Sequence, residues 1–138
     1  MEQTACIIKP DAFPKFTGEI ISRLLNEHFV IDIAGTFRFD QTSMDSFYFE
    51  HIGSEYYERL SQFMCSGPSL GMVLSRPQAI STLRRSMGPT KIDAREVGQI
   101  RYEFGNPDHP ERNCLHGSDS HAAARFEIDF LRGLLGVR

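Results

Sequence analysis

The stretch TACIIKP at residues 4–10 decides the fold. Four consecutive apolar residues, Ala5 to Ile8, are typical of a short buried strand. Pro10 cannot donate a hydrogen bond to a neighbouring strand, so the strand is expected to stop at Lys9. The charged side chain of Lys9 is therefore expected at the end of a strand.

A helix and a second strand are predicted next. Thr17 is expected to cap a helix running to about His28, because Glu19 lies in its first turn and apolar residues follow at helical spacing. Residues 31–39 alternate between apolar and other side chains, which is the pattern of a half-buried strand. Gly35 interrupts this pattern and is interpreted as a β-bulge.

The middle of the chain is predicted to be mostly helical. Apolar side chains recur at three- or four-residue spacing, and Gly and Pro separate the segments. The predicted elements are a helix at residues 44–51, a helix opened by Ser54 and ended by residues 66–68, a strand at residues 71–74 and a helix at residues 77–87.

The last third of the chain begins with a loop. Residues 88–112 contain several Gly and Pro residues and little periodicity, and structureless loops of this length are usually functional. A short strand is predicted near residues 113–115. The capping cluster Ser118 to Ser120 then starts a helix whose apolar residues continue to Leu131.

This order of elements predicts the α+β class. A ferredoxin-like α/β sandwich is favoured, in which helices cover a four-stranded antiparallel sheet. The 138 residues suit one compact core, and no repeat or linker is visible, so residues 1–138 are predicted to form a single domain.

Composition argues against several classes of protein. Hydrophobic residues make up 41% and charged residues 24%, as in an ordinary globular domain. The apolar stretches are well short of the roughly 20 residues that cross a bilayer, and Glu2 opposes a signal peptide. Cys6, Cys65 and Cys114 fit no disulfide framework, which favours the cytoplasm, with an organelle as the alternative.

Charge is distributed unevenly along the chain. The net charge of -3 argues against broad binding of nucleic acid, which needs a basic surface. Residues 84–101 nevertheless carry a local charge of +3. Such a basic segment could attract a small polyanion, and the alternative is an ordinary solvated surface.

His116 and Glu127 are the residues best placed for chemistry. His116 follows the last predicted strand, where connecting loops gather, although most histidines in such places have no catalytic role. Glu127 falls in the apolar zone of the last helix, where an unpaired carboxylate is costly. A bond to His116 would satisfy it and leave one imidazole nitrogen as a nucleophile. The alternative is that Glu127 reaches solvent or pairs with Arg125 or Arg132.

Phosphoryl transfer is one reaction that such a pair permits. It needs cationic groups around the transferred phosphate, and Lys9, Arg84 and Arg101 are suitable in type. These residues are far apart in the sequence, so only the fold could unite them.

Residues 113–120 read NCLHGSDS and resemble the N-x-x-H-G-S-D-S signature of nucleoside diphosphate kinases. The likeness continues over nearly the whole chain, with further matching segments in the same order. These segments are IKPDA at residues 8–12, FMCSGP at residues 63–68, MGPT at residues 87–90 and IR at residues 100–101.

The resemblance implies a ping-pong enzyme that moves a γ-phosphate from a nucleoside triphosphate to a diphosphate through phosphorylated His116. It implies that Glu127 orients His116, that Ser118 bonds near this pair, and that Tyr48 and Lys9 belong to the catalytic groups. The implied substrate contacts are Lys9 and Asn113 at the sugar, Tyr56 and Leu60 at the base, and Arg84, Thr90 and Arg101 at the phosphates.

The same resemblance implies the cofactor and the partners. Mg²⁺ is expected to be held by the nucleotide phosphates, with Asp119 reaching the ion through water. The expected partners are ATP, GTP, GDP and other nucleotides, together with further copies of this chain in at least a dimer. Neither a membrane nor nucleic acid is expected.

A few positions depart from the usual family pattern. Tyr102 follows Arg101 where Gly is usual, Pro89 stands where Glu is usual, and a short insertion precedes Asn113. With Ala94-Arg95, these features resemble the divergent type 6 branch of the family.

Two other readings of the site remain. One is a catalytically weak nucleotide-binding or scaffold module of the same fold. The other is a metal site made of Cys114, His116 and His121, although their spacing matches no common zinc pattern.

Overall fold

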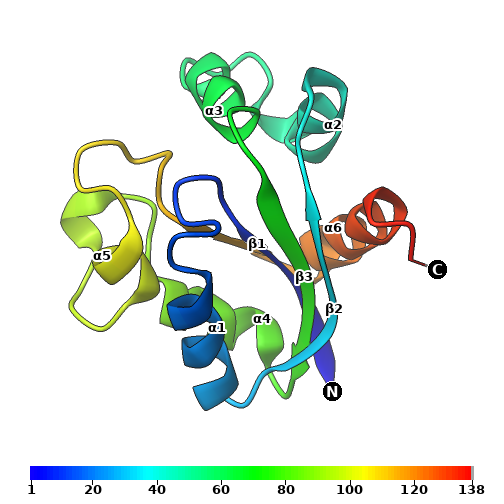
Figure 1. Cartoon of the computed structure of the whole chain (residues 1–138), viewed down its shortest axis with the longest axis vertical. Coiled ribbons are helices and arrows are strands. Elements are labelled where there is room, and N and C mark those ends of the chain that lie inside the picture. The colour runs from blue at the N-terminus through cyan, green and yellow to red at the C-terminus, as the bar shows by residue number, and fades with distance from the viewer. Residues whose placement is uncertain (138) are drawn as a thin grey trace.

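The computed structural model describes residues 1–137 and contains one four-stranded antiparallel sheet (Figure 1). Its strands are β1 (Glu2–Ile8), β2 (Val30–Phe37), β3 (Ser69–Arg76) and β4 (Leu115–Gly117). They lie in the order β2-β3-β1-β4, so β1 pairs with both β3 and β4. This order and the antiparallel pairing confirm the predicted ferredoxin-like α+β fold.

Six α-helices accompany these strands within the described residues. They are α1 (Thr17–Asn26), α2 (Gln41–Phe47), α3 (Tyr57–Met64), α4 (Ala79–Met87), α5 (Ile100–Phe104) and α6 (His121–Leu134). None of the helices in residues 1–137 has the length and apolar character that a membrane span requires.

Both faces of the sheet are covered, which explains why β1 is continuously apolar. On one face, Cys6 and Ile8 share a core with residues of α1, α4 and α5. On the other face, Ala5 and Ile7 share a second core with residues of α2, α3 and α6. Side chains alternate along a strand, so a strand between two cores is apolar at every position. Figure 1 shows α1 and α4 on one side of the strands and α6 on the other.

Two helices in the first half begin at other residues than predicted. Thr17 is the first residue of α1, and Phe16 holds the capping position without a side-chain hydrogen bond. α2 begins at Gln41, before the predicted Met44, because Asp40 and Ser43 form a capping box. The Ser43 N–H donates to Asp40 Oδ1 over 2.8 Å.

The segment between α2 and α3 also differs from the prediction. α2 ends at Phe47, and a separate 3-10 turn covers Phe49–His51. Ser54 does not cap the next helix, since its hydroxyl donates to the carbonyl of His51 and α3 begins at Tyr57.

Gly35 has a different role from the bulge that the sequence suggested. The irregularity in β2 lies between Ile31 and Ile33, and Gly35 pairs in register with Gly71. A Cβ atom at Gly35 would lie 2.9 Å from Leu135 Cδ2, and one at Gly71 would lie 3.0 Å from Leu131 Cδ2. The two glycines therefore make room for the C-terminal end of α6 and the residue after it.

The last third of the chain contains more structure than predicted. Residues 88–112 are mostly loop, as predicted, but they also include a 3-10 turn at Ile92–Ala94 and the short helix α5. β4 begins at Leu115, and His116 therefore lies within the strand rather than after it. The predicted cap of the last helix is confirmed, because Ser120 Oγ accepts the N–H of Ala123 over 3.0 Å.

Gly117 ends β4 at the point where this strand touches α4. A Cβ atom there would lie 2.9 Å from Cδ2 of the fully buried Leu83. We predict that Gly117→Ala lowers the free energy of unfolding by about 1–3 kcal/mol, because the packed leucine has little room to move. Urea unfolding followed by circular dichroism measures this change.

Gly18→Ala in α1 is the matched control. A Cβ atom there meets no atom within 4 Å, and alanine favours a helix, so this variant should not be destabilised. Equal losses in the two variants would contradict the packing explanation.

Candidate active site

His116 and Glu127 form the centre of the site. His116 lies on β4 opposite Ile7 of β1, and Glu127 lies on α6. His116 Nε2 and Glu127 Oε1 are 2.8 Å apart, with 18% and 12% of the two side chains exposed. A carboxylate can only accept, so Nε2 carries the proton and Nδ1 of the neutral imidazole is left with its lone pair.

Ser118 fixes the position of the Glu127 carboxylate. Its hydroxyl donates to the same oxygen, Glu127 Oε1, over 2.8 Å. The Ser118 hydroxyl also accepts the N–H of Ala5 over 3.2 Å, which ties it to the central strand. Glu127 therefore turns toward His116 and Ser118 rather than toward solvent.

Two aromatic rings hold the imidazole edge-on. The ring centre of His116 lies 5.2 Å from that of Phe47 and 6.0 Å from that of Tyr48. The hydroxyl of Tyr48 is buried and has no hydrogen-bond partner within residues 1–137. Burial, with the nearby charge of Glu127, raises the pKa of this hydroxyl well above its usual range, so it stays protonated.

A row of rings continues from Tyr48 toward the surface. The ring centre of His51 lies 5.8 Å from that of Tyr48, and His51 Nδ1 contacts the hydroxyl of Tyr56. Tyr56 is 42% exposed at the outer end of this row, and Leu60 is buried one turn further along α3. The predicted base contacts therefore lie at one end of a line that leads to the imidazole.

Arg101 lies buried on α5 and reaches the backbone beside His116. Its Nη2 donates to the carbonyl of Leu115 over 2.8 Å, and its Nη1 donates to the carbonyl of Gly88 over 3.0 Å and to Thr90 Oγ1 over 3.3 Å. Burial, with the charges of Arg84 and Arg95, lowers the pKa of Arg101 to about 10, so the group remains a cation at neutral pH. The three predicted phosphate contacts are thus linked through Arg101, which bonds to Thr90 and lies close enough to Arg84 for their charges to repel.

Lys9 lies at the end of β1, as its place before Pro10 predicted, and the structure shows that it is also buried. The backbone N–H of Lys9 donates to the backbone carbonyl of Cys114 over 2.9 Å. Burial, together with repulsion from Arg101, lowers the pKa of the Lys9 ammonium group to about 7. A large fraction of Lys9 is therefore neutral near pH 7 in the free protein.

Asn113 is held ready to accept a hydrogen bond. Asp11 Oδ2 accepts the N–H of Cys114 over 3.1 Å, which supports a residue whose φ is 67°. Asn113 Nδ2 donates to the carbonyl of Pro110 over 2.9 Å. Asn113 Oδ1 is buried and has no partner in the described part of the chain.

The metal site suggested for Cys114, His116 and His121 does not form. Cys114 Sγ points at the carbonyl of Ile100 over 3.8 Å, and the exposed His121 pairs with Glu2 at 3.5 Å. No group of three or more His, Cys, Asp or Glu side chains within residues 1–137 could hold a metal ion. Asp119 is exposed in the irregular segment between β4 and α6.

Sequence reasoning missed Phe47, His51, Asp11 and Arg95. The Arg95 guanidinium donates to the carbonyls of Thr90 over 2.9 Å and Asn106 over 3.2 Å and so fixes the segment after α4. No motif could reveal this role, because every residue has a carbonyl. Asp11 did leave a signal, since a carboxylate directly after the strand end at Lys9-Pro10 can reach the neighbouring backbone.

Comparisons with known proteins all lead to one family. A family model described as nucleoside diphosphate kinase matches residues 2–132. The nucleoside diphosphate kinase of Listeria monocytogenes is 38% identical over 129 residues, which are 93% of this chain and 86% of that protein. The enzyme of Methanocaldococcus jannaschii is 39% identical over 130 residues, which are 92% of this chain and 90% of that protein.

Solved structures of the same kind of enzyme have the same fold. A crystal form of the Aquifex aeolicus nucleoside diphosphate kinase superposes with a TM-score of 0.87 at 37% identity and covers 94% of both chains. The Halobacterium salinarum enzyme in complex with CDP gives a TM-score of 0.88 at 30% identity, over 94% of this chain and 86% of that one. The match in sequence over nearly the whole chain and the match in structure show that the chain belongs to the nucleoside diphosphate kinase family.

Proposed function

We propose that this chain is a nucleoside diphosphate kinase that transfers the γ-phosphate of a nucleoside triphosphate to a diphosphate through phosphorylated His116. The bond between His116 Nε2 and Glu127 carries this proposal, because it leaves Nδ1 as an oriented nucleophile. The relatives that share its sequence and fold are nucleoside diphosphate kinases.

The reaction takes place in two half-reactions at the same atom. Nδ1 attacks the γ-phosphorus, an N–P bond forms, and the bond to the bridging oxygen breaks, so that the diphosphate leaves. Glu127 stabilises the positive charge that the imidazole gains, without removing its proton. An oxygen of the second diphosphate then attacks the phosphorus, and the N–P bond breaks to restore neutral His116.

We assign the phosphate contacts to Arg84, Thr90 and Arg101, and the sugar contacts to Lys9 and Asn113. The buried Oδ1 of Asn113, which has no partner within residues 1–137, supports the sugar contact of Asn113, since it can accept from a sugar hydroxyl.

The base is assigned to Tyr56 and Leu60, and Tyr48 is counted among the catalytic groups. The exposure of the Tyr56 ring suits stacking, which accepts any base and predicts broad nucleotide specificity. The relative from Halobacterium salinarum was solved with CDP.

Mg²⁺ is the proposed cofactor, and the donor set suits this ion. Asp119 offers one exposed carboxylate beside the catalytic segment, and Mg²⁺ is usually bound by one or two carboxylates plus phosphates and water. Asp119 would hold the ion through water, and the bound ion supplies neutralisation of the phosphate charge.

The finer relationships of the chain are also proposals. We assign it to the type 6 branch because Pro89, Ala94-Arg95 and the insertion before Asn113 resemble that branch. We propose a single domain over residues 1–138. The free thiols Cys6, Cys65 and Cys114 support the cytoplasm, with an organelle as the alternative.

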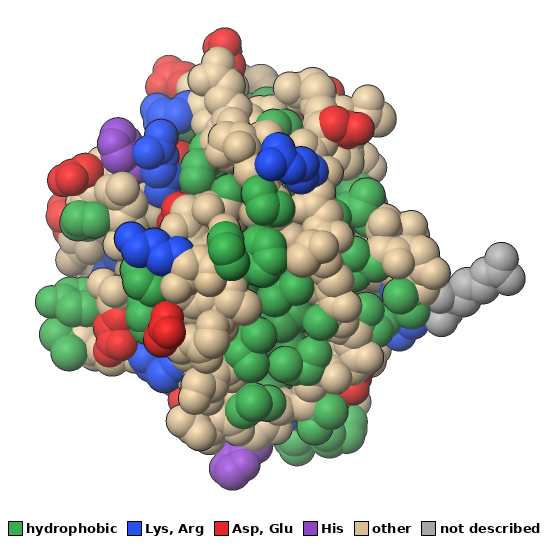
Figure 2. Space-filling model, viewed as in Figure 1, with side chains coloured by type: hydrophobic (Ala, Val, Ile, Leu, Met, Phe, Trp, Pro, Cys, Tyr) green, Lys and Arg blue, Asp and Glu red, His purple; other side chains and the backbone are tan. Residues whose placement is uncertain are grey.

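A homo-oligomer, at least a dimer, is proposed as well. β2 lies at the edge of the sheet, and its Val30 is 52% exposed. Figure 2 shows hydrophobic side chains gathered on the face of the molecule along which β2 runs in Figure 1. An unpaired edge strand with apolar neighbours favours association with another chain.

Incubation with Mg²⁺ and γ-³²P-ATP should label the protein through an acid-labile, base-stable bond. A chase with GDP should move the label to GTP, because the N–P bond is an intermediate. His116→Ala should abolish the label, whereas His121→Ala, at an exposed histidine outside the site, should keep it. Label retained in His116→Ala would refute the nucleophile, and unlabelled wild-type protein that binds ATP would point to the binding module.

Glu127→Gln should slow phosphorylation by about 10- to 100-fold, because the imidazolium loses its charged partner. The KM for ATP should change less than about twofold, because Glu127 contacts the histidine and not the nucleotide. Single-turnover quench-flow measures the rate. Asp129→Asn, at an exposed carboxylate on the same helix, is the matched control, and equal rates in the two variants would contradict the role of Glu127.

Binding of ADP at pH 8 should be accompanied by uptake of close to one proton per protein, because the neutral amine of Lys9 becomes protonated in the complex. The pKa of Lys9 is about 7 in the free protein, so the amine is mostly neutral at pH 8. The negative charge of the ADP phosphates should raise the pKa of Lys9, so that the amine becomes protonated when ADP binds. Calorimetric titration in buffers of different ionisation enthalpy measures the uptake. Lys9→Met should lose it, and the same uptake in that variant would assign the proton to another group.

A further inference from the structure

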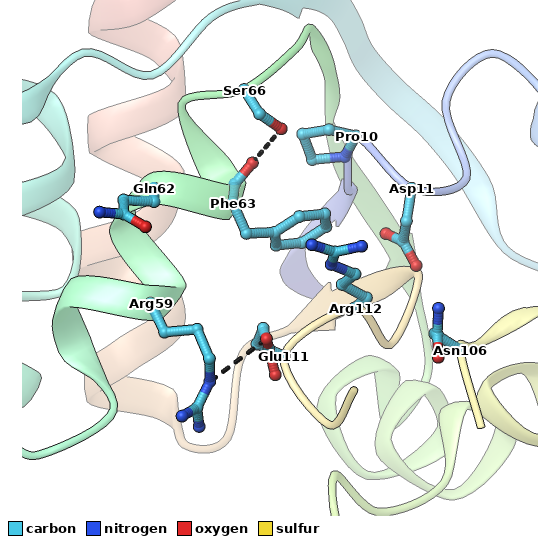
Figure 3. A pocket seen from close by; sticks show the side chains of 9 residues that line it. All are labelled: Pro10, Asp11, Arg59, Gln62, Phe63, Ser66, Asn106, Glu111 and Arg112. Carbon is cyan, nitrogen blue, oxygen red and sulfur yellow. Dashed lines mark hydrogen bonds and ion pairs between the residues drawn. The ribbon is translucent and has the colours of Figure 1, made fainter. Parts of the chain in front are cut away.

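Arg59 and Glu111 join α3 to the segment of residues 106–112. Arg59 Nε and Glu111 Oε1 lie 3.2 Å apart, and Figure 3 shows this ion pair at one side of a pocket. The glutamate side chain is only 8% exposed, whereas the arginine side chain is 59% exposed. The other oxygen, Glu111 Oε2, is buried without a hydrogen-bond partner in residues 1–137. This buried carboxylate therefore depends on Arg59.

A second contact between the same two elements lies beside the ion pair. The guanidinium of Arg112 lies 5.6 Å from the ring centre of Phe63 on α3. Figure 3 shows Arg112 between Phe63 and Asp11, in the pocket of about 430 Å³ that Arg59 and Glu111 also line. Two consecutive residues of the segment thus hold it against α3.

Residues 106–112 are closed by their own hydrogen bonds. The N–H of Asn106 donates to the carbonyl of Arg112 over 2.7 Å. Asn106 Oδ1 accepts the N–H groups of Asp108 and His109 over 2.7 and 3.1 Å. Because of these internal hydrogen bonds, residues 106–112 are expected to move together. The contacts of this segment with α3 therefore set the distance between the segment and the helix.

The residues assigned to the nucleotide lie on both α3 and the chain that follows residues 106–112. Leu60 follows Arg59 on α3, with Tyr56 one turn earlier, and Asn113 follows Arg112. We propose that the Arg59–Glu111 ion pair is a positioning device that sets the width of the nucleotide slot between α3 and residues 110–113, and thereby nucleotide affinity. This inference rests on the proposed function, since it places the nucleotide between these elements.

The two partners contribute unequally because their burial differs. Loss of Arg59 leaves the Glu111 carboxylate buried and unpaired, which is costly, so the segment has to move until water reaches the carboxylate. Loss of the Glu111 charge leaves an arginine that is already solvated, which costs little. A neutral residue at position 111 should therefore relieve most of the defect caused by the loss of Arg59.

The test compares Arg59→Met, Arg59→Lys, Glu111→Gln and the double variant Arg59→Met with Glu111→Gln. Affinity is measured as the Kd for a fluorescent ADP analogue, and turnover as kcat and KM for phosphate transfer from ATP to GDP. Arg125→Met, at an exposed arginine of α6, is the matched control. Urea unfolding verifies that each variant is folded.

Arg59→Met should raise Kd and KM by about 3- to 10-fold and leave kcat within about twofold, because the pair does not contact His116. Arg59→Lys and Arg125→Met should stay close to wild type. The double variant should bind ADP better than Arg59→Met alone, which independent effects would not produce.

An unchanged Kd in Arg59→Met, a loss of kcat without a rise in Kd, or multiplied losses in the double variant would each overturn the proposal. Wild-type protein that binds ADP but transfers no phosphate would refute the proposed function alone, and the Kd series would still judge the ion pair. Wild-type protein that does not bind the ADP analogue would overturn both.

Discussion

The pairing of β4 with β1 holds the whole site in place, although it involves only Leu115, His116 and Gly117 of β4. The short ladder fixes the backbone of the nucleophile against β1, in which residues 4–8 are fully buried. The other groups are tied to the same pair of strands. Ser118 bonds to Ala5, Lys9 bonds to the carbonyl of Cys114, and Arg101 bonds to the carbonyl of Leu115. A rigid scaffold of this kind supplies the fixed geometry that phosphoryl transfer requires.

The sheet also keeps opposite charges of the site apart. His116 pairs with Ile7, which belongs to the core under α2, α3 and α6, whereas Leu115 belongs to the core under α1, α4 and α5. Glu127 approaches the imidazole from α6, and Arg101 approaches from α5 and bonds to backbone carbonyls. A direct ion pair between Glu127 and Arg101 would use up both groups. Because they are separated, the arginine keeps its charge for an anion and the carboxylate keeps its hold on the histidine.

The sequence allowed the α+β class, the helix-covered antiparallel sheet and the pair of His116 and Glu127 to be predicted, because these follow from apolar periodicity and the cost of a buried carboxylate. The exact bounds of the helices could not be predicted, because they depend on local hydrogen bonds. Asp40 with Ser43 moved the start of α2, and α5 formed within a segment rich in glycine and proline. The family signature located residues whose distances no pattern gives, such as the phosphate contacts. Arg95 and the ion pair of Arg59 with Glu111 left no signal, because their partners are defined only by the folded backbone.

The facing glycines of β2 and β3 restrict which residues can replace the leucines at the C-terminal end of the chain. Gly35 and Gly71 lie opposite each other, and the side chains of Leu131 and Leu135 occupy the space that two Cβ atoms would fill. An alanine at Gly35 is compatible with this packing only if Leu135 becomes smaller. An alanine at Gly71 is compatible with it only if both Leu131 and Phe37 make room. In an alignment of many relatives, these strand and helix positions should therefore vary together, with the summed side-chain volume nearly constant while each single residue changes.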